Sequence, residues 1–508
     1  MNKIQMTFSL INLMIGETAL VLPVLFNQEG YISCILVLIL QGFISYKTCG
    51  ILVANLKPKE NDVSDTIQRI LGIKWWKFFQ ILSCIYLYLV SLQYFLLCNN
   101  MIYRMITFLM LISGNDNFAA PSHFSYSQFS LQYLGYISAI PIGFLTFIRK
   151  MDILVKISEY GIYSIFSFVI FIFTVFISNV ASGRLGRSSS QVNLWSFDIG
   201  NVSGASAIGY SVHTTIGPVI KQHKNQDENY KILGFAYFSV FLIYLSIGLF
   251  GGLGILGRDL RAEFGENIND YFSQTDVSIF IVQILYFVNL ITCLPMSLFI
   301  SRQRLFQFFY SEREPPQQLF VGFNLFYVFL CILLQNIPSI KSEDLMNVNG
   351  AITCFFTMYL IPIILHFQAY HGQDSLMLRL KKSISKLGVI DDSEIALEST
   401  LLSGVKSQKE DKYNLFINDD EDSDEDLNED VPSSKQNQQN PKQMKQTLKD
   451  KKEFEEQKKK LIENQSKNFS IIFYGIIGLI GLISLIYGIF ALSKKFFSSN
   501  PDSILDDD

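Results

Sequence analysis

One hydrophobic segment near the amino terminus determines the architecture: Phe8-Ser-Leu-Ile-Asn12-Leu-Met-Ile-Gly16-Glu17-Thr18-Ala-Leu-Val-Leu22-Pro23-Val-Leu-Phe26. It is long enough to cross a lipid bilayer, but a glycine, a carboxylate and a hydroxyl lie near its middle and a proline follows. An unsatisfied backbone group in hydrocarbon costs several kcal/mol, so an interrupted helix is tolerated only where it lines a cavity within the protein. The segment is therefore typical of the broken helices with which secondary transporters bind substrate.

The composition of the whole chain is that of a polytopic membrane protein. Its 508 residues are 49% hydrophobic and only 17% charged. No basic segment with a small-residue cleavage site precedes the first span, so we expect that span to be retained as a helix. No loop pairs a basic stripe with stacking aromatic residues, so nucleic-acid binding is not expected. The seven cysteines lie in or beside apolar spans without metal-ligand spacing, which predicts buried thiols.

Eleven apolar spans predict an all-α polytopic membrane protein with 11 transmembrane helices. They cover approximately residues 7–26, 32–56, 76–108, 133–148, 154–178, 202–220, 232–256, 277–300, 319–337, 345–368 and 469–492. Residues 369–468 form a polar insert before the last span, and its acidic and low-complexity runs are expected to be disordered. A tolerated solvated loop is favoured for this insert over a site for a cytoplasmic partner.

The distribution of charge orients the spans. Lysine and arginine are roughly twice as frequent in the short loops on the amino-terminal side as in those on the opposite side. We therefore expect the amino terminus and the insert in the cytoplasm. With eleven spans, the short acidic tail, residues 494–508, is then extracellular or luminal. The plasma membrane and a vacuolar or lysosomal membrane both remain open, as does the oligomeric state.

A second interrupted span lies five helices after the first. Small residues from Ser203 to Ser211 interrupt the sixth span, as residues 15–18 interrupt the first. Breaks at corresponding positions of two five-helix units, residues 1–180 and 181–368, indicate an inverted repeat with a binding site near the membrane midplane. The positive end of a half-helix can face a carboxylate there, while freed carbonyls can hold an ammonium group or a cation. This favours an amino acid, which carries both charges.

Four motifs, taken in order, resemble the amino acid/auxin permease family. They are Asn12-Leu-Met-Ile-Gly16 with Ala19-Leu-Val-Leu-Pro23, Arg149-Lys-Met-Asp-Ile-Leu, Tyr210-Ser-Val-His213 with Pro218, and Leu294-Pro295-Met-Ser-Leu-Phe-Ile-Ser-Arg302. The resemblance covers about residues 1–370 and the last helix, 469–493. It implies a LeuT-type five-plus-five inverted repeat with one extra carboxyl-terminal helix, and amino acid symport with Na⁺ or H⁺. The chain departs from the family's usual Gly-x-Gly at the first break, where Glu17 and Thr18 follow Gly16.

The two breaks supply the predicted substrate site: Asn12, Ile15, Gly16, Glu17, Thr18, Ala205, Ser206, Gly209 and Tyr210. For Asn12, an interhelical hydrogen bond is the alternative to a ligand contact. Thr292 and Ser297 could give hydroxyls to a Na⁺ site, although such hydroxyls more often bond their own backbone. We predict no other metal and no cofactor. His213 and Pro218 are assigned to gating or packing, with a proton relay as the alternative for His213.

Glu17 has three competing interpretations. A carboxylate at membrane depth is costly, so such residues usually face a cavity and have a function. Glu17 could bind the proton that drives transport, since desolvation raises the pKa of a carboxyl. It could instead cap the second half-helix, or pair with a cationic substrate side chain. We favour proton coupling over capping, and place a basic substrate last because no other feature points to one.

The sequence therefore predicts a cation-coupled amino acid transporter that works by alternating access. An enzyme is not expected, because no set of nucleophile, base and orienting residue recurs in the loops. The alternative is an amino acid sensor or scaffold of the same fold, which signals through residues 369–468 and transports little. The preferred amino acid, the coupling ion and the direction of transport remain open.

Overall fold

The computed structural model describes residues 2–57, 60, 62–114, 129–149, 151–158, 160–188, 192–223, 225–258, 268–273, 275–310, 316–337, 342, 345–346, 349–370, 472–482 and 485–486. The predicted insert and the acidic tail lie outside these residues, apart from the first two positions of the insert. The chain divides into two units, Met1–Leu365 with Ile476–Asp508, and His366–Gly475. In the second unit, the rings of His366 and Tyr474 lie 4.2 Å apart between centroids.

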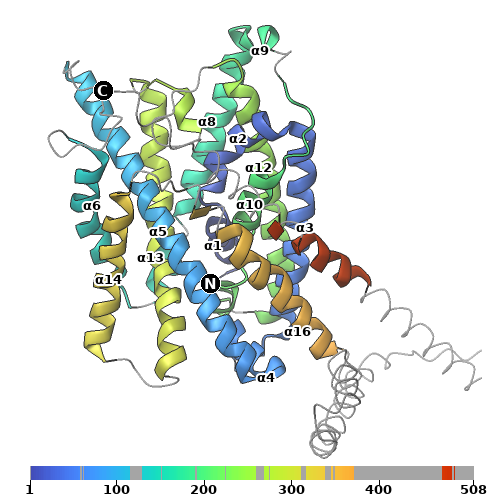
Figure 1. Ribbon diagram of the computed structural model, residues 1–508. Helices are drawn as coiled ribbons and strands as arrows, with labels where there is room; N and C mark the ends of the chain where they lie inside the picture. Colours follow the sequence, from blue (N-terminus) through green and yellow to red (C-terminus); the bar gives the residue numbers. More distant parts are fainter. Residues whose placement is uncertain are drawn as a thin grey trace, which may run out of the picture. The chain divides into compact units, whose positions relative to one another are not determined.

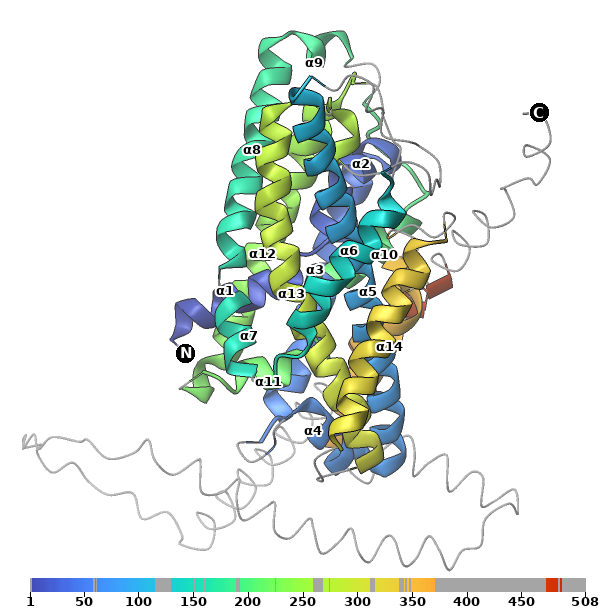
Figure 2. The same cartoon turned by 90° about the vertical axis from the view of Figure 1, so that its left-hand side faces the viewer.

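All regular secondary structure in the described residues is helical. The helices labelled in Figures 1 and 2 are α1 Lys3–Met14, α2 Thr18–Glu29, α3 Tyr31–Asn55, α4 Val63–Leu71, α5 Ile73–Ile112, α6 Leu131–Thr146, α7 Met151–Ser158, α8 Gly161–Ala181, α9 Arg184–Arg187, α10 Gly200–Gly209, α11 Ile216–Ile220, α12 Asn229–Ile255, α13 Val277–Tyr310, α14 Gln317–Gln335 and α16 Ile361–Tyr370. Two π-helices, Asn349–Thr353 and Phe355–Leu360, precede α16.

Seven helices among the described residues are long and apolar enough to cross a membrane. They correspond to the predicted second, third, fifth, seventh, eighth, ninth and tenth spans. Helices α1 and α2 together make an eighth candidate, whereas α6 and Ile472–Leu482 are shorter apolar helices. The sixth predicted span is divided between α10 and α11. The all-helical membrane class is thus confirmed, while eleven full spans and the inverted repeat stay predictions.

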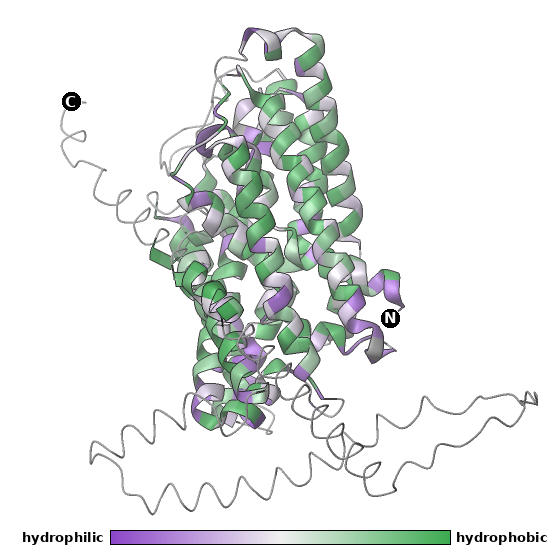
Figure 3. Cartoon of the chain, turned by 90° about the vertical axis from the view of Figure 1, so that its right-hand side faces the viewer, coloured by the Kyte–Doolittle hydropathy of each residue, from purple (hydrophilic) through white to green (hydrophobic). Residues whose placement is uncertain are grey.

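The outer surfaces of these helices are apolar, as lipid-facing helices require. Figure 3 shows hydrophobic residues along most of the helical ribbon. Large side chains such as Phe144 of α6, Ile170 of α8 and Phe235 of α12 are exposed. Inside the bundle, α5 packs extensively against α13, and α12 packs against α2, α3 and α8.

The first span breaks at the predicted glycine. Helix α1 ends at Met14, Ile15 is extended, and α2 begins at Thr18 at an angle of 55° to α1. A Cβ atom on Gly16 would lie 2.5 Å from the Tyr94 hydroxyl oxygen of α5. A side chain at this position would have to displace the Tyr94 ring, and the low helix propensity of glycine assists the break.

The sixth span breaks in the same manner. Helix α10 ends at Gly209, and the chain resumes as the short helix α11 at Ile216. We call residues 210–215 between them the unwound segment. A Cβ atom on Gly209 would lie 2.7 Å from the Tyr244 hydroxyl oxygen and 3.0 Å from Thr18. Both predicted breaks are therefore present, and at each of them a side chain in place of glycine would have to displace a neighbouring tyrosine.

Candidate functional site

The two breaks contact each other directly. The Thr18 hydroxyl of α2 donates a hydrogen bond to the carbonyl of Ala205 in α10, with a distance of 2.9 Å. The Tyr244 hydroxyl of α12 lies 2.7 Å from the Met14 carbonyl and 3.3 Å from the Gly209 carbonyl, so its proton serves both breaks. Both hydroxyls are buried. The sequence predicted that the breaks would meet but gave no sign that Tyr244 joins them.

Helices α2 and α10 are also joined at their other ends. The carboxylate of Glu29, the last residue of α2, accepts hydrogen bonds from the backbone nitrogens of Asn201 and Val202 at 3.1 Å and 3.0 Å. A carboxylate at this position satisfies free N–H groups at the start of α10 and complements its positive end. The two half-helices are therefore tied together both at the breaks and away from them.

Two side chains of α13 donate hydrogen bonds to backbone carbonyls at the first break. The Asn289 amide donates to the carbonyl of Ile15 at 3.2 Å, and the Tyr286 hydroxyl donates to the carbonyl of Gly16. Tyr286, Asn289 and Cys293 follow one another at helical spacing, so they share one face of α13. This spacing of polar groups in an apolar span was the signal that could have revealed them from the sequence.

The second break is satisfied in the same way from α3, α5 and α12. The Tyr210 carbonyl accepts hydrogen bonds from Ser45 at 2.8 Å and from the Tyr237 hydroxyl at 3.0 Å. The Ser211 carbonyl accepts one from the Tyr86 hydroxyl at 3.3 Å. A buried carbonyl without a hydrogen-bond partner is destabilising. These donors therefore replace the helical hydrogen bonds that the unwound segment lacks.

A cavity lies beside the first break, between α1, α2, α5, the unwound segment and α13. Its lining contains one charged residue and many apolar and aromatic ones: Leu13, Met14, Gly16, Glu17, Thr18, Tyr86, Leu87, Val90, Gln93, Tyr94, Ile208, Ser211, Thr215, Cys293 and Ser297. Of the predicted site residues, Gly16, Glu17, Thr18 and Ser297 line it. Near the second break, the lining is formed by Ile208, Ser211 and Thr215 rather than by the neighbouring residues that the sequence favoured.

Glu17 is the charged residue of this cavity. Its side chain is 3% exposed, and its carboxylate accepts a hydrogen bond from the Gln93 amide of α5. Although Glu17 immediately precedes α2, its side chain makes no capping hydrogen bond to that helix. Of the three interpretations, capping therefore receives no support from the geometry. A cavity-lining carboxylate can bind a proton or a cationic group.

Several other predicted residues lie behind the cavity. Asn12 is fully buried, and its amide nitrogen contacts the Cys293 sulfur at 3.3 Å, which is an interhelical contact. The carbonyl of Ala205 faces Thr18, and Ser206 donates to Ser203 in its own helix at 3.1 Å. Ile15 and Tyr210 contribute the carbonyls described above.

The hydroxyls proposed for a Na⁺ site bond to their own helix. Thr292 donates to the carbonyl of Asn289 at 2.7 Å, and Ser297 to that of Cys293 at 3.3 Å. His213 is fully buried, with its Nε2 atom 2.9 Å from the Thr48 hydroxyl of α3, and Pro218 is half-buried in α11. Within the described ranges, no group of three or more His, Cys, Asp or Glu residues could hold a metal ion.

Parts of this chain are similar in sequence to known proteins. The family model described as "Transmembrane amino acid transporter protein" matches residues 2–386. "Neutral amino acid transporter 9" of Danio rerio is 24% identical over 167 residues, which are 32% of this chain and 30% of that protein. Its counterpart in Xenopus tropicalis is 21% identical over 193 residues, or 37% and 34% of the two chains. The matched part thus spans about a third of these relatives.

Solved structures give more distant similarities. The crystal structure of MhsT in complex with L-phenylalanine has a TM-score of 0.47 and 12% identity, covering 74% of this chain and 93% of that one. A manganese transporter of Eremococcus coleocola, in complex with an aromatic bis-isothiourea substituted compound, has a TM-score of 0.41 and 12% identity. That match covers 96% of this chain and 94% of the transporter.

Proposed function

We propose, on the premise that this chain belongs to the transmembrane amino acid transporter protein family, that it carries amino acids across a membrane by alternating access. Membership makes the chain a multi-pass transporter rather than an enzyme. The observation that carries the proposal is the meeting of two broken helices beside a cavity that contains a buried carboxylate. Broken helices of this kind provide both charges that a zwitterionic substrate needs.

The amino acid is proposed to bind in the cavity beside the first break. Helix α2 begins at Thr18, which lines the cavity, so the positive end of this helix can attract the substrate carboxylate. Leu87, Val90 and Ile208 give the lining apolar surface that suits an uncharged side chain. The names of the two curated relatives, which are called neutral amino acid transporters, support a neutral substrate.

Proton coupling is proposed in preference to sodium coupling. The carbonyls of Ile15 and Gly16, which a Na⁺ ion would share, already accept hydrogen bonds from Asn289 and Tyr286. The Thr292 hydroxyl bonds to its own helix. Glu17, by contrast, is a buried group in the cavity that can take up and release a proton. We also propose that the helices form a five-plus-five inverted repeat and that the amino terminus lies in the cytoplasm.

The test is uptake by the purified protein in proteoliposomes. A panel of labelled neutral, acidic and basic amino acids is offered under an inward pH gradient, an inward Na⁺ gradient, or neither. We expect neutral amino acids to accumulate against their own gradient when the pH gradient is present. Protein-free liposomes are the control for leakage. Saturable binding without accumulation under any gradient would refute the transport proposal and favour the sensor.

A further inference from the structure

A buried ion pair lies two helical turns from the cavity along α13. The guanidinium of Arg304 contacts the carboxylate of Asp62, which precedes α4, and the side chains are 1% and 9% exposed. Burying two charges carries a large desolvation free energy. The attraction within the pair offsets this free energy only where additional hydrogen bonds satisfy both groups. The other contacts of the two side chains therefore indicate what the pair holds in place.

Arg304 reaches the unwound segment. Its Nη2 atom donates a hydrogen bond to the carbonyl of Thr214 at 2.9 Å. Its guanidinium also lies over the ring of Phe79 in α5, with the carbon 5.1 Å from the ring centroid. Thr214 stands directly before Thr215, which lines the cavity. One arginine thus connects α13, α5, Asp62 and the part of the sixth span that borders the cavity.

Asp62 in turn contacts the helix that follows the unwound segment. Its carboxylate accepts hydrogen bonds from the Val63 nitrogen at 2.6 Å and from the Ser64 hydroxyl at 3.3 Å, which fixes the start of α4. A Cβ atom on Gly217 of α11 would lie 2.6 Å from an Asp62 carboxylate oxygen. The backbone of α11 at Gly217 therefore lies close against Asp62 at the start of α4.

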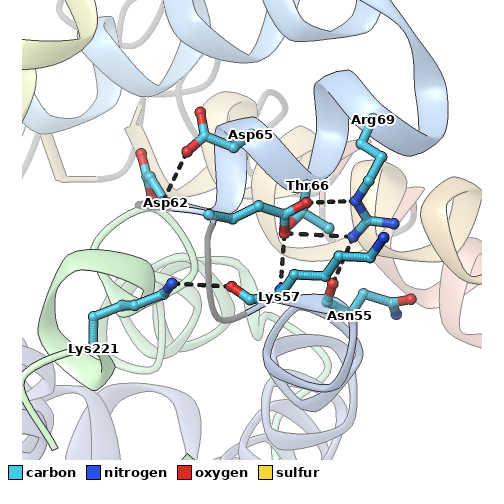
Figure 4. Close-up of polar contacts among 8 residues, drawn as sticks. Asn55, Lys57, Asp62, Asp65, Thr66, Arg69 and Lys221 are labelled. Carbon is cyan, nitrogen blue, oxygen red and sulfur yellow. Dashed lines mark hydrogen bonds and ion pairs between the residues drawn. The ribbon is translucent and has the colours of Figure 1, made fainter.

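The chain that leads to Asp62 is itself held by polar contacts (Figure 4). Arg69 of α4 pairs with Glu60 and donates to the carbonyl of Asn55 at 2.8 Å. Lys221, next to α11, donates to the carbonyl of Lys57 at 3.0 Å. Burial raises the pKa of Glu60, but its hydrogen bonds, chiefly the one from Arg69, lower the pKa more, so the carboxyl stays charged at neutral pH.

We propose that Arg304 is a positioning residue for transport, which holds the unwound segment against the cavity, and that Asp62 locks it there. The pair separates when the cavity opens toward α4, and Thr215 then becomes accessible from that side. The role in transport that we assign to this ion pair rests on the proposed function. The contacts themselves do not depend on the identity of the transported molecule.

The test measures access to Thr215 with a membrane-impermeant thiol reagent. Thr215→Cys is introduced alone and together with Asp62→Asn, which keeps the size of the side chain but removes its charge. We expect Asp62→Asn to raise the labelling rate of the new cysteine by about tenfold or more, since breaking one side of a buried ion pair is strongly unfavourable. Each protein is compared with the same protein lacking the new cysteine, because native Cys293 also lines the cavity.

Glu60→Gln is the matched control, because it removes the charge of a nearby carboxylate that does not contact the unwound segment, while the glutamine oxygen can still accept the hydrogen bonds from Arg69 and Thr66 that hold this part of the chain. It should leave the labelling rate unchanged. Where Asp62→Asn does not fold, Arg304→Lys replaces it, since lysine keeps the charge but lacks the second arm that reaches Thr214. Unchanged labelling in a folded Asp62→Asn or Arg304→Lys variant would overturn the proposal. The measurement needs no substrate, so a failure to observe transport would leave its result intact.

Discussion

Replacing Tyr244 with phenylalanine would remove one oxygen atom from the point where the two broken helices meet. The hydroxyl is fully buried and serves the carbonyls of Met14 and Gly209 at 2.7 Å and 3.3 Å. The ring would keep its edge-on packing against Tyr210, whose centroid lies 5.4 Å away. The substitution therefore isolates the hydrogen bonds from the packing of the side chain.

The size of the effect follows from what the two carbonyls lose. Leaving a buried acceptor without its donor costs about 1–3 kcal/mol, and hydrogen bonds between membrane helices average about 0.6 kcal/mol. We expect loss of this shared hydroxyl to destabilise the arrangement of the two breaks by about 1–2 kcal/mol, which is roughly a 5- to 30-fold change in an equilibrium constant. Because the hydroxyl joins the breaks beside the cavity, amino acid affinity should weaken by about this factor.

Tyr327→Phe is the matched control for this substitution. The Tyr327 hydroxyl is also fully buried and donates to a backbone carbonyl, that of Ser91, at 2.9 Å, but it joins α14 to α5 away from the breaks. Binding of a labelled amino acid and thermal unfolding are measured for both variants. Both should lose similar stability, and only Tyr244→Phe should lose affinity. Wild-type affinity in Tyr244→Phe, or an equal loss in both variants, would refute the reasoning.

Two further predictions concern the break glycines and the topology. Gly16→Leu and Gly209→Leu should abolish uptake while the protein still purifies as a folded species, because even a Cβ would lie 2.5 Å from the Tyr94 hydroxyl oxygen in the first case and 2.7 Å from that of Tyr244 in the second. Near wild-type uptake in either variant would show that transport does not depend on this close contact at the break. Tags at residue 2 and after Ser434 should react only once the cytoplasmic side is opened, whereas a tag after the last residue should react from the opposite side. Labelling of the Ser434 tag in intact, correctly oriented membranes would contradict the proposed orientation.

The parts of the site that the sequence predicted are those that are anomalous within an apolar span. Gly16, Glu17 and Gly209 are visible because a helix breaker or a charge in hydrocarbon needs a structural reason. The resemblance to a transporter family is confirmed, and it was carried by short motifs around the same positions. The breaks were therefore predictable from local chemistry alone.

The partners of the breaks were not predictable in the same way. Tyr244 is an ordinary residue for a membrane helix, and its hydroxyl matters only because α12 packs beside the breaks. In the sequence, Asp62 is an ordinary loop carboxylate. Only the folded structure shows that it pairs with Arg304, which is far away in the sequence. Such pairings arise from tertiary packing, which leaves no periodic pattern in one sequence.

The proposed coupling through Glu17 is tested most directly by Glu17→Gln in proteoliposomes. Glutamine has the shape of glutamate and can still accept the hydrogen bond from Gln93, but it cannot titrate. Two measurements are made on each protein: exchange of labelled for unlabelled amino acid without a gradient, and accumulation driven by an inward pH gradient. We predict that Glu17→Gln keeps exchange and loses pH-driven accumulation. Accumulation with unchanged size and unchanged pH dependence in the variant would contradict the account.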